Sequence, residues 1–130
     1  MSAMAKLAAF DSQKYLSLET HRKNGQAVRT PVWFAAAPGP ILYVYTVADS
    51  GKAKRLRRTG EARIAVCNAR GTITGPWSNV RATIVDGDAF AEGMRFLDHK
   101  YWPWKQILDL AHRLFPRHRR VMIAIKPIPG

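Results

Sequence analysis

The residues with the clearest chemical potential form one basic segment near the middle of the chain. It runs Asp49-Ser50-Gly51-Lys52-Ala53-Lys54-Arg55-Leu56-Arg57-Arg58 and carries five cations, with no acid after Asp49. Asp49 or Ser50 can cap the first turn of a helix here, and Gly51 lets a ligand approach the backbone. The free N–H groups of that turn add to the charges of Lys52, Lys54 and Arg55. The segment therefore predicts a phosphate site at the start of a helix.

Charge alone favours a plainer interpretation of the same segment, a solvated basic helix face. Its position in the chain favours phosphate binding instead. The segment directly follows the apolar stretch Ile41-Leu42-Tyr43-Val44-Tyr45-Thr46, which has the composition of a strand. A strand that leads into a glycine turn and a helix start is a recurrent architecture for phosphorylated cofactors.

The length and charge of the chain bound its class. Its 130 residues predict one domain over 1–130, and a hydrophobic fraction of 47% is sufficient for a folded core. Lys and Arg number 21 against 9 Asp and Glu, which gives a net charge of +12. Such a charge favours anionic partners, whether nucleic acid, anionic lipid or a small polyanion, and does not choose among them.

The cysteine content and the N-terminus predict a cytoplasmic protein without a membrane segment. Cys67 is the one cysteine, so the chain has no internal disulfide, and the apolar run around it predicts a buried thiol. The first ten residues lack the apolar core of a signal peptide, and no apolar run approaches the length of a membrane span.

Apolar alternation predicts a mainly β protein. An Asn24-Gly25 turn joins two alternating stretches into a hairpin, and Pro31 in its second strand indicates an edge or a bulge. The predicted strands cover 15–20, 27–35, 41–46, 63–68, 77–85 and 121–125. The predicted helices cover the basic segment to Arg58, then 89–101 and 104–115, with Asp86-Gly87-Asp88 as the stop of the preceding strand. Six antiparallel strands at short spacing indicate a small barrel, because closure removes exposed edges.

As an ordered set, several of these stretches resemble a known family, the pyridoxamine 5′-phosphate oxidase-like split barrels. The stretches are Tyr15-Leu16-Ser17-Leu18, Val28-Arg29-Thr30-Pro31-Val32-Trp33-Phe34 after Asn24-Gly25, Leu42-Tyr43-Val44 through Arg57, and Gly71 to Gly75. Within the family they are most similar to the deazaflavin-dependent reductases that use coenzyme F420. The resemblance implies an FMN-binding split-barrel fold, a homodimer and an oxidoreductase activity.

The cofactor that the resemblance implies depends on the phosphate turn. In the flavin-using branch an Arg-Lys pair holds the FMN phosphate; here Lys52 matches the lysine and Gly51 stands in place of the arginine. The turn with Lys54 and Arg55 is more similar to the F420 branch, whose cofactor carries a phosphodiester and an oligoglutamate tail that would meet the surplus cations. FMN remains the alternative cofactor.

The resemblance also implies where the cofactor ring lies. It would lie against the strand Arg29 to Trp33, so Thr30, Pro31, Val32 and Trp33 are candidate ring contacts. Ser50 would add a donor to the phosphate, and Gly75 and Trp77 would come from the partner chain of the dimer. Tyr45 or Thr46 is a candidate proton donor to the acceptor.

Other kinds of site find less support in the sequence. The four histidines are scattered and Cys67 has no cysteine partner, so no metal site is predicted. No nucleophile-elbow motif is present for acyl transfer, and no histidine can be singled out as a haem ligand.

Three functional hypotheses stay open from the sequence. The first is a redox enzyme that transfers a hydride from reduced F420 to a small organic acceptor, with the cofactor supplying the chemistry. The second is a cofactor carrier of the same fold, which sequence does not separate from an enzyme. The third is a nucleic-acid-binding barrel. The placement of the cations argues against it, because they gather at one helix start instead of alternating with aromatic residues along a strand.

Overall fold

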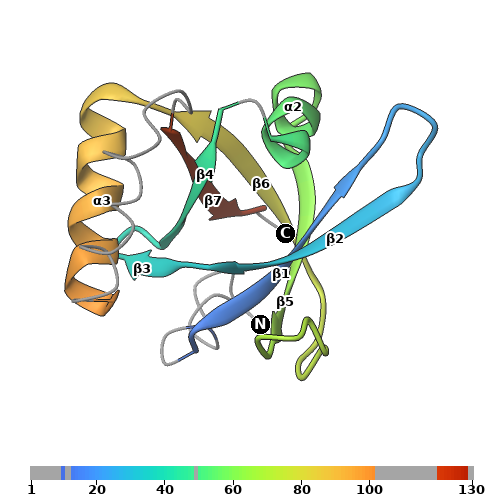
Figure 1. Cartoon of the computed structure of the whole chain (residues 1–130), viewed down its shortest axis with the longest axis horizontal. Coiled ribbons are helices and arrows are strands. Elements are labelled where there is room, and N and C mark those ends of the chain that lie inside the picture. The colour runs from blue at the N-terminus through green and yellow to red at the C-terminus, as the bar shows by residue number, and fades with distance from the viewer. Residues whose placement is uncertain (1–9, 11–12, 49, 102–119, 129–130) are drawn as a thin grey trace.

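Antiparallel strands dominate the computed structural model, which describes Phe10 and residues 13–48, 50–101 and 120–128 (Figure 1). The elements are β1 (Tyr15–His21), β2 (Ala27–Trp33), β3 (Ala35–Ala37), β4 (Ile41–Val47), α2 (Gly51–Arg58), β5 (Glu61–Cys67), β6 (Ser78–Val85), α3 (Gly87–Tyr101) and β7 (Arg120–Pro127). The predicted helix over 104–115 lies outside the described residues. In the part of the chain that is described, no helix is long and apolar enough to cross a membrane.

The strands form one curled sheet in the order β2-β1-β5-β6-β7-β4-β3, with every pair antiparallel. Only Phe34 separates β2 from β3, so one bent stretch of chain supplies both edges of the sheet. The sheet therefore wraps around its core as a split barrel, which confirms the predicted mainly β fold.

The strand count differs from the prediction because the expected strand over 27–35 is divided at Phe34. The Phe34 side chain is fully buried, and its carbonyl accepts a hydrogen bond of 2.9 Å from Lys100 Nζ on α3. At this residue the chain leaves its pairing with β1 and begins its pairing with β4. The structure thus has seven strands where the alternation predicted six.

The barrel core is built from the inward-facing residues of the strands. Leu16 and Leu18 of β1, Ile64 of β5 and Ile123 and Ile125 of β7 are almost completely buried in it. Each such side chain contributes about 1.5 to 3 kcal/mol through removal from water. Thr20 shares this face of β1, whereas Ser17 and Glu19 lie on the opposite face and are buried as well.

Helix α3 packs on the outside of β3, β4 and β7 and makes a second apolar cluster there (Figure 1). Tyr43 stacks on Phe96 with ring centroids 6.3 Å apart, and Leu97 is buried beside them. The predicted helix over 89–101 is confirmed, but Gly87 and Asp88 belong to it instead of to the strand stop. The Asp88 carboxylate lies in the first turn, where the helix dipole favours negative charge.

The local signals of the β1–β2 hairpin are confirmed. Gly25 adopts a φ of +88°, which favours glycine, and its N–H donates to Arg22 O at 2.8 Å. Pro31 lies on β2 at one edge of the sheet, where the missing N–H costs no ladder bond. Cys67 is buried as predicted, and burial raises the pKa of its thiol.

Candidate functional site

The first turn of α2 is anchored to the end of β4 through two hydroxyl groups. Ser50 is the N-cap residue, and its Oγ accepts a hydrogen bond of 3.3 Å from the backbone N–H of Ala53. Its Oγ also lies 3.2 Å from Thr46 Oγ1, which is buried on β4. The predicted cap is therefore Ser50, and the buried contact makes Thr46 a support for that cap. The N–H groups of Gly51 and Lys52 have no intrahelical acceptor at this end of the helix.

Three cations lie near this turn, Lys52, Arg55 and Arg22, and no ion pair among the described residues joins any of them to a carboxylate. Burial, and secondly the charge of Arg55, lowers the pKa of the Lys52 ammonium. Burial, and secondly the charge of Arg22 at the hairpin tip, lowers the pKa of the Arg55 guanidinium. Within the described residues the ion pairs all involve Glu19, and none reaches Lys52 or Arg55. The described part of the site therefore carries positive charge that an anion would offset.

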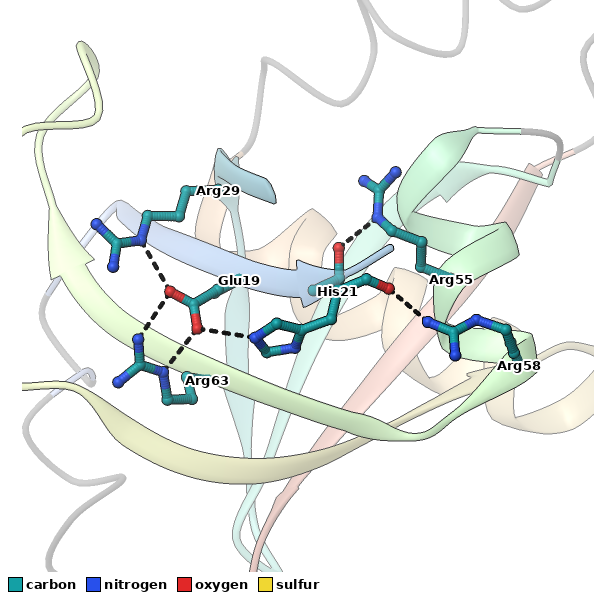
Figure 2. A network of polar contacts seen from close by, with 7 residues as sticks. Glu19, His21, Arg29, Arg55, Arg58 and Arg63 are labelled. Carbon is teal, nitrogen blue, oxygen red and sulfur yellow. Dashed lines mark hydrogen bonds and ion pairs between the residues drawn. The ribbon is translucent and has the colours of Figure 1, made fainter. Parts of the chain in front are cut away.

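The arginines of α2 are nevertheless held in place, because neutral acceptors fix them (Figure 2). Arg55 Nε donates to Thr20 Oγ1 at 2.6 Å, and Arg58 Nη2 donates to His21 O at 2.6 Å. Arg57 Nη1 donates to Ala48 O at 2.6 Å. A hydroxyl or a carbonyl orients a guanidinium without cancelling its charge. Together with the exposed Lys54, these side chains form a basic surface on α2.

Gly51 has a role in this turn that the sequence did not reveal. A Cβ at this position would lie 2.7 Å from Arg55 Nη1. The guanidinium of Arg55 therefore folds back over the backbone of the first turn, in the space that a side chain at Gly51 would occupy. The approach of a ligand to this glycine stays a prediction; in the described structure the group that lies over it is the protein's own Arg55 guanidinium.

The predicted ring-binding residues lie along β2, the edge strand. Thr30 and Val32 are half-buried on its inner side, Pro31 is exposed on its outer side, and the half-buried Trp33 has its ring centroid 6.3 Å from that of Tyr15. An edge strand presents backbone N–H and C=O groups that have no neighbouring strand to bind. Such a row of groups can bind the polar edge of a planar ligand.

The segment 68–77 folds back beside this edge from β5. A Cβ at Gly71 would lie 3.7 Å from the ring of Pro31, and one at Gly75 would lie 3.5 Å from Val66 Cβ. The Thr74 N–H donates to Val66 O at 2.9 Å and holds the segment against β5. The structure thus places the predicted residue Gly75 next to β5, and Gly71 next to β2, within one chain.

Trp77 ends this segment and lies between two arginines of different strands. The Arg29 guanidinium carbon is 4.6 Å from the centroid of its ring, and that of Arg63 is 5.0 Å away. Both distances are within the range of cation–π attraction. The structure therefore brings Trp77 close to Arg29 on β2 of its own chain, and Arg29 lies two residues before Pro31.

A buried carboxylate organises these arginines, and the prediction of site residues did not include it. Glu19 is only 1% exposed, and it lies directly opposite Arg29 of β2 and Arg63 of β5. It accepts hydrogen bonds from Arg29 Nε at 2.8 Å and from Arg63 Nε and Nη2 at 2.7 and 2.9 Å (Figure 2). The bonds from Arg63, and then the bond from Arg29, outweigh the effect of burial and lower the Glu19 pKa to about 2.

Part of this cluster was within reach of the sequence. The Asn24-Gly25 turn sets the hairpin register, and that register places Glu19 opposite Arg29. The pairing of Glu19 with Arg63 joins strands that are far apart in the sequence. Among the described residues, no group of three His, Cys, Asp or Glu side chains could hold a metal ion.

Solved structures show the same arrangement of elements. The chain superposes on the heme storage protein HutZ from Vibrio cholerae with a TM-score of 0.71, at 14% identity, over 100% of this chain and 93% of that one. It superposes on a putative pyridoxamine 5′-phosphate oxidase from Listeria innocua with a TM-score of 0.61, at 14% identity, over 98% and 93%. An F420 reductase gives a TM-score of 0.59 at 18% identity over 94% and 92%.

No family model and no curated protein sequence matches this chain. The structural likenesses establish its fold, the split barrel of pyridoxamine 5′-phosphate oxidase-like proteins, as the resemblance in the sequence implied. Proteins of this fold include oxidoreductases and heme-binding proteins by their names.

Proposed function

We propose that this chain is an oxidoreductase that binds reduced coenzyme F420 and passes a hydride to a small organic acceptor. The observation that carries the proposal is the first turn of α2, where Lys52 and Arg55 lie at a helix start capped by Ser50 and the helix itself has no acid in that turn. A helix start of this kind favours a phosphate group. In this proposal Ser50, Gly51, Lys52, Lys54 and Arg55 bind the phosphate.

The residues present fit a cofactor with more than one anionic group. Beyond the turn, the basic surface of α2 continues through Arg57 and Arg58 toward Arg22 of the hairpin tip. FMN has a single phosphate and would leave most of this surface unused. A phosphodiester followed by several carboxylates would meet it along its length. This difference favours F420 over FMN.

Thr30, Pro31, Val32 and Trp33 seat the planar ring at the open edge of β2 in this proposal. The deazaflavin supplies the hydride donor when bound, and the chain supplies position and charge. A second copy of the chain, with its own Gly75 and Trp77, covers the opposite side of the ring. Tyr15 and Leu16 of β1 lie opposite Trp33 and Val32, and these side chains would exclude water from that end of the ring strand.

An equilibrium titration tests the proposal directly. The purified protein is titrated with F420 and, in parallel, with FMN, and tryptophan quenching and cofactor fluorescence are followed at low and moderate salt. Lys52→Ala should weaken F420 binding by about 1 to 3 kcal/mol, or about five- to 150-fold, because a charged hydrogen bond is lost. Lys126→Ala on β7 removes the same charge from an exposed position outside the site and is the matched control.

The outcomes separate the alternatives. Binding of F420 alone, weakened by Lys52→Ala and not by the control, supports the reductase, and turnover with an acceptor then separates an enzyme from a carrier. Tighter binding of FMN would bring forward flavin oxidoreductase chemistry. If neither cofactor binds, the phosphate-site assignment is refuted and the nucleic-acid hypothesis is favoured.

A further inference from the structure

We propose that Arg29, Arg63 and Trp77 form a second ligand site, for a small planar aromatic molecule that carries a carboxylate or a phosphate. The site lies on the outer face of β2, β1 and β5. Thr20 and Arg55, which donates a hydrogen bond to Thr20, lie on the opposite side of β1. The site shares Trp77 with the proposed function but uses neither the cofactor nor the phosphate turn of α2, so the protein without cofactor tests it apart from that function.

The carboxylate of Glu19 fixes the two guanidiniums from below. Arg29, Glu19 and Arg63 occupy directly opposite positions on three neighbouring strands, so the two arginines flank one acid. Because Glu19 is 1% exposed and its pKa is about 2, it stays ionised and in place over the whole physiological range. The rigid row contains two positive charges and one negative charge, which leaves a net charge of +1.

Each guanidinium keeps donors that Glu19 does not use. An arginine has five N–H donors. Arg29 binds Glu19 through Nε alone, and Arg63 binds it through Nε and Nη2. The two Nη atoms of Arg29 and Nη1 of Arg63 donate to no other described residue. Figure 2 shows these free ends directed to the same side, away from His21.

These donors are accessible to a ligand. The side chains of Arg29 and Arg63 are 52% and 39% exposed, whereas the acid that holds them is buried. An anion that approaches from the outer side meets two oriented guanidiniums that have already lost much of their conformational freedom to Glu19. This preorganisation lowers the entropic cost of binding.

Trp77 determines which anions the site favours. Its half-buried ring lies within 4.6 and 5.0 Å of the two guanidinium carbons, so an anion held by the arginines also lies beside an indole. A planar aromatic group on the ligand would contact this ring while the carboxylate or phosphate binds the free Nη groups. Inorganic phosphate lacks the ring, and a neutral aromatic amide lacks the charge.

If the proposed function holds, such a molecule is the class of acceptor that would be bound near the edge of β2. Arg29 lies on β2 two residues before Pro31, and Gly71 of the segment that ends at Trp77 approaches Pro31. This extension rests on the proposed function, whereas the binding site itself does not.

The experiment uses the full chain labelled with ¹⁵N, and the indole N–H signal of Trp77 is assigned by its loss in Trp77→Phe. Benzoate and phenyl phosphate are titrated as probes, with benzamide and inorganic phosphate as controls for charge and ring. The two aromatic anions should shift the Trp77 signal, and the two controls should not. Arg29→Gln should weaken that binding at least tenfold, because it removes the charge and the fork of donors. Arg81→Gln on β6, which removes the same charge from an exposed position, should change it less than twofold.

The proposal is overturned if benzamide shifts the Trp77 signal as strongly as benzoate, or if Arg29→Gln binds the aromatic anions as tightly as the wild type. It is also overturned if the anions perturb only the amides of Gly51 and Lys52, a result that would leave the phosphate site of α2 standing. If Arg29→Gln proves unstable, Arg29→Lys keeps the charge without the fork. Arg29→Lys should then bind the aromatic anions more weakly than the wild type and show a smaller shift of the Trp77 indole signal.

Discussion

Replacement of Glu19 by glutamine should destabilise the protein in a manner that depends on pH. Glu19→Gln keeps the size of the side chain and removes the charge that separates Arg29 from Arg63. A neutral amide then lies between the two partly exposed guanidiniums, and their mutual repulsion is no longer offset. Near neutral pH the variant should therefore unfold at a lower denaturant concentration than the wild type.

The magnitude follows from the pKa of Glu19. The pKa falls from 4.5 to about 2 on folding. At 1.36 kcal/mol per pKa unit, this difference corresponds to about 3 kcal/mol of stability at pH 7. Because the folded pKa is the lower one, this stability is fully present above pH 4.5 and is lost as the pH falls toward 2. At pH 3 roughly 1 kcal/mol of it should remain.

The assay is chemical denaturation of the wild type and Glu19→Gln at several pH values between 7 and 3. The difference in the free energy of unfolding between the two proteins should shrink from about 3 to roughly 1 kcal/mol over this range. Glu61→Gln is the matched control, because Glu61 is an exposed acid on β5 without an ion pair in the described structure. A difference that stays constant with pH, or a variant as stable as the wild type, would refute the assignment of the low pKa to the paired carboxylate.

Two further predictions concern the packing that holds the site. Lys100→Met should destabilise the protein by about 1 to 3 kcal/mol in thermal or chemical unfolding, because the carbonyls of Phe34 and Gln13 lose their hydrogen-bond donor, the Lys100 ammonium. A stability equal to that of the wild type would show that water replaces the ammonium without cost. Gly93→Ala should destabilise by about 1 to 3 kcal/mol although alanine favours helices, because its Cβ would lie 2.9 Å from atoms of Tyr43 and Met122; a gain in stability would mean that α3 shifts outward without loss of its contacts.

The hairpin, the strands and the start of α2 were predictable from the sequence because their signals are local. The Asn24-Gly25 turn, the alternation in β1 and the cap at Ser50 depend on residues a few positions apart. The division of the strand at Phe34 was not predictable in this way, since the Phe34 carbonyl accepts its hydrogen bond from Lys100 of α3, which lies 66 residues later in the chain. The seventh strand therefore follows from a tertiary contact.

By itself, the sequence determined the class of the protein: a basic, mainly β chain with a capped cationic helix start after a strand. Composition and short-range spacing carry that information, because they set charge, periodicity and turns. The tertiary structure decided which charges are neutralised. Arg29 and Arg63 meet a buried acid that joins three strands, whereas the partners of Arg55 and Arg58 in the described part of the chain are a hydroxyl and a carbonyl. A net charge of +12 says nothing of this division, because the partner of each cation depends on strand register and on the placement of α2 on the sheet.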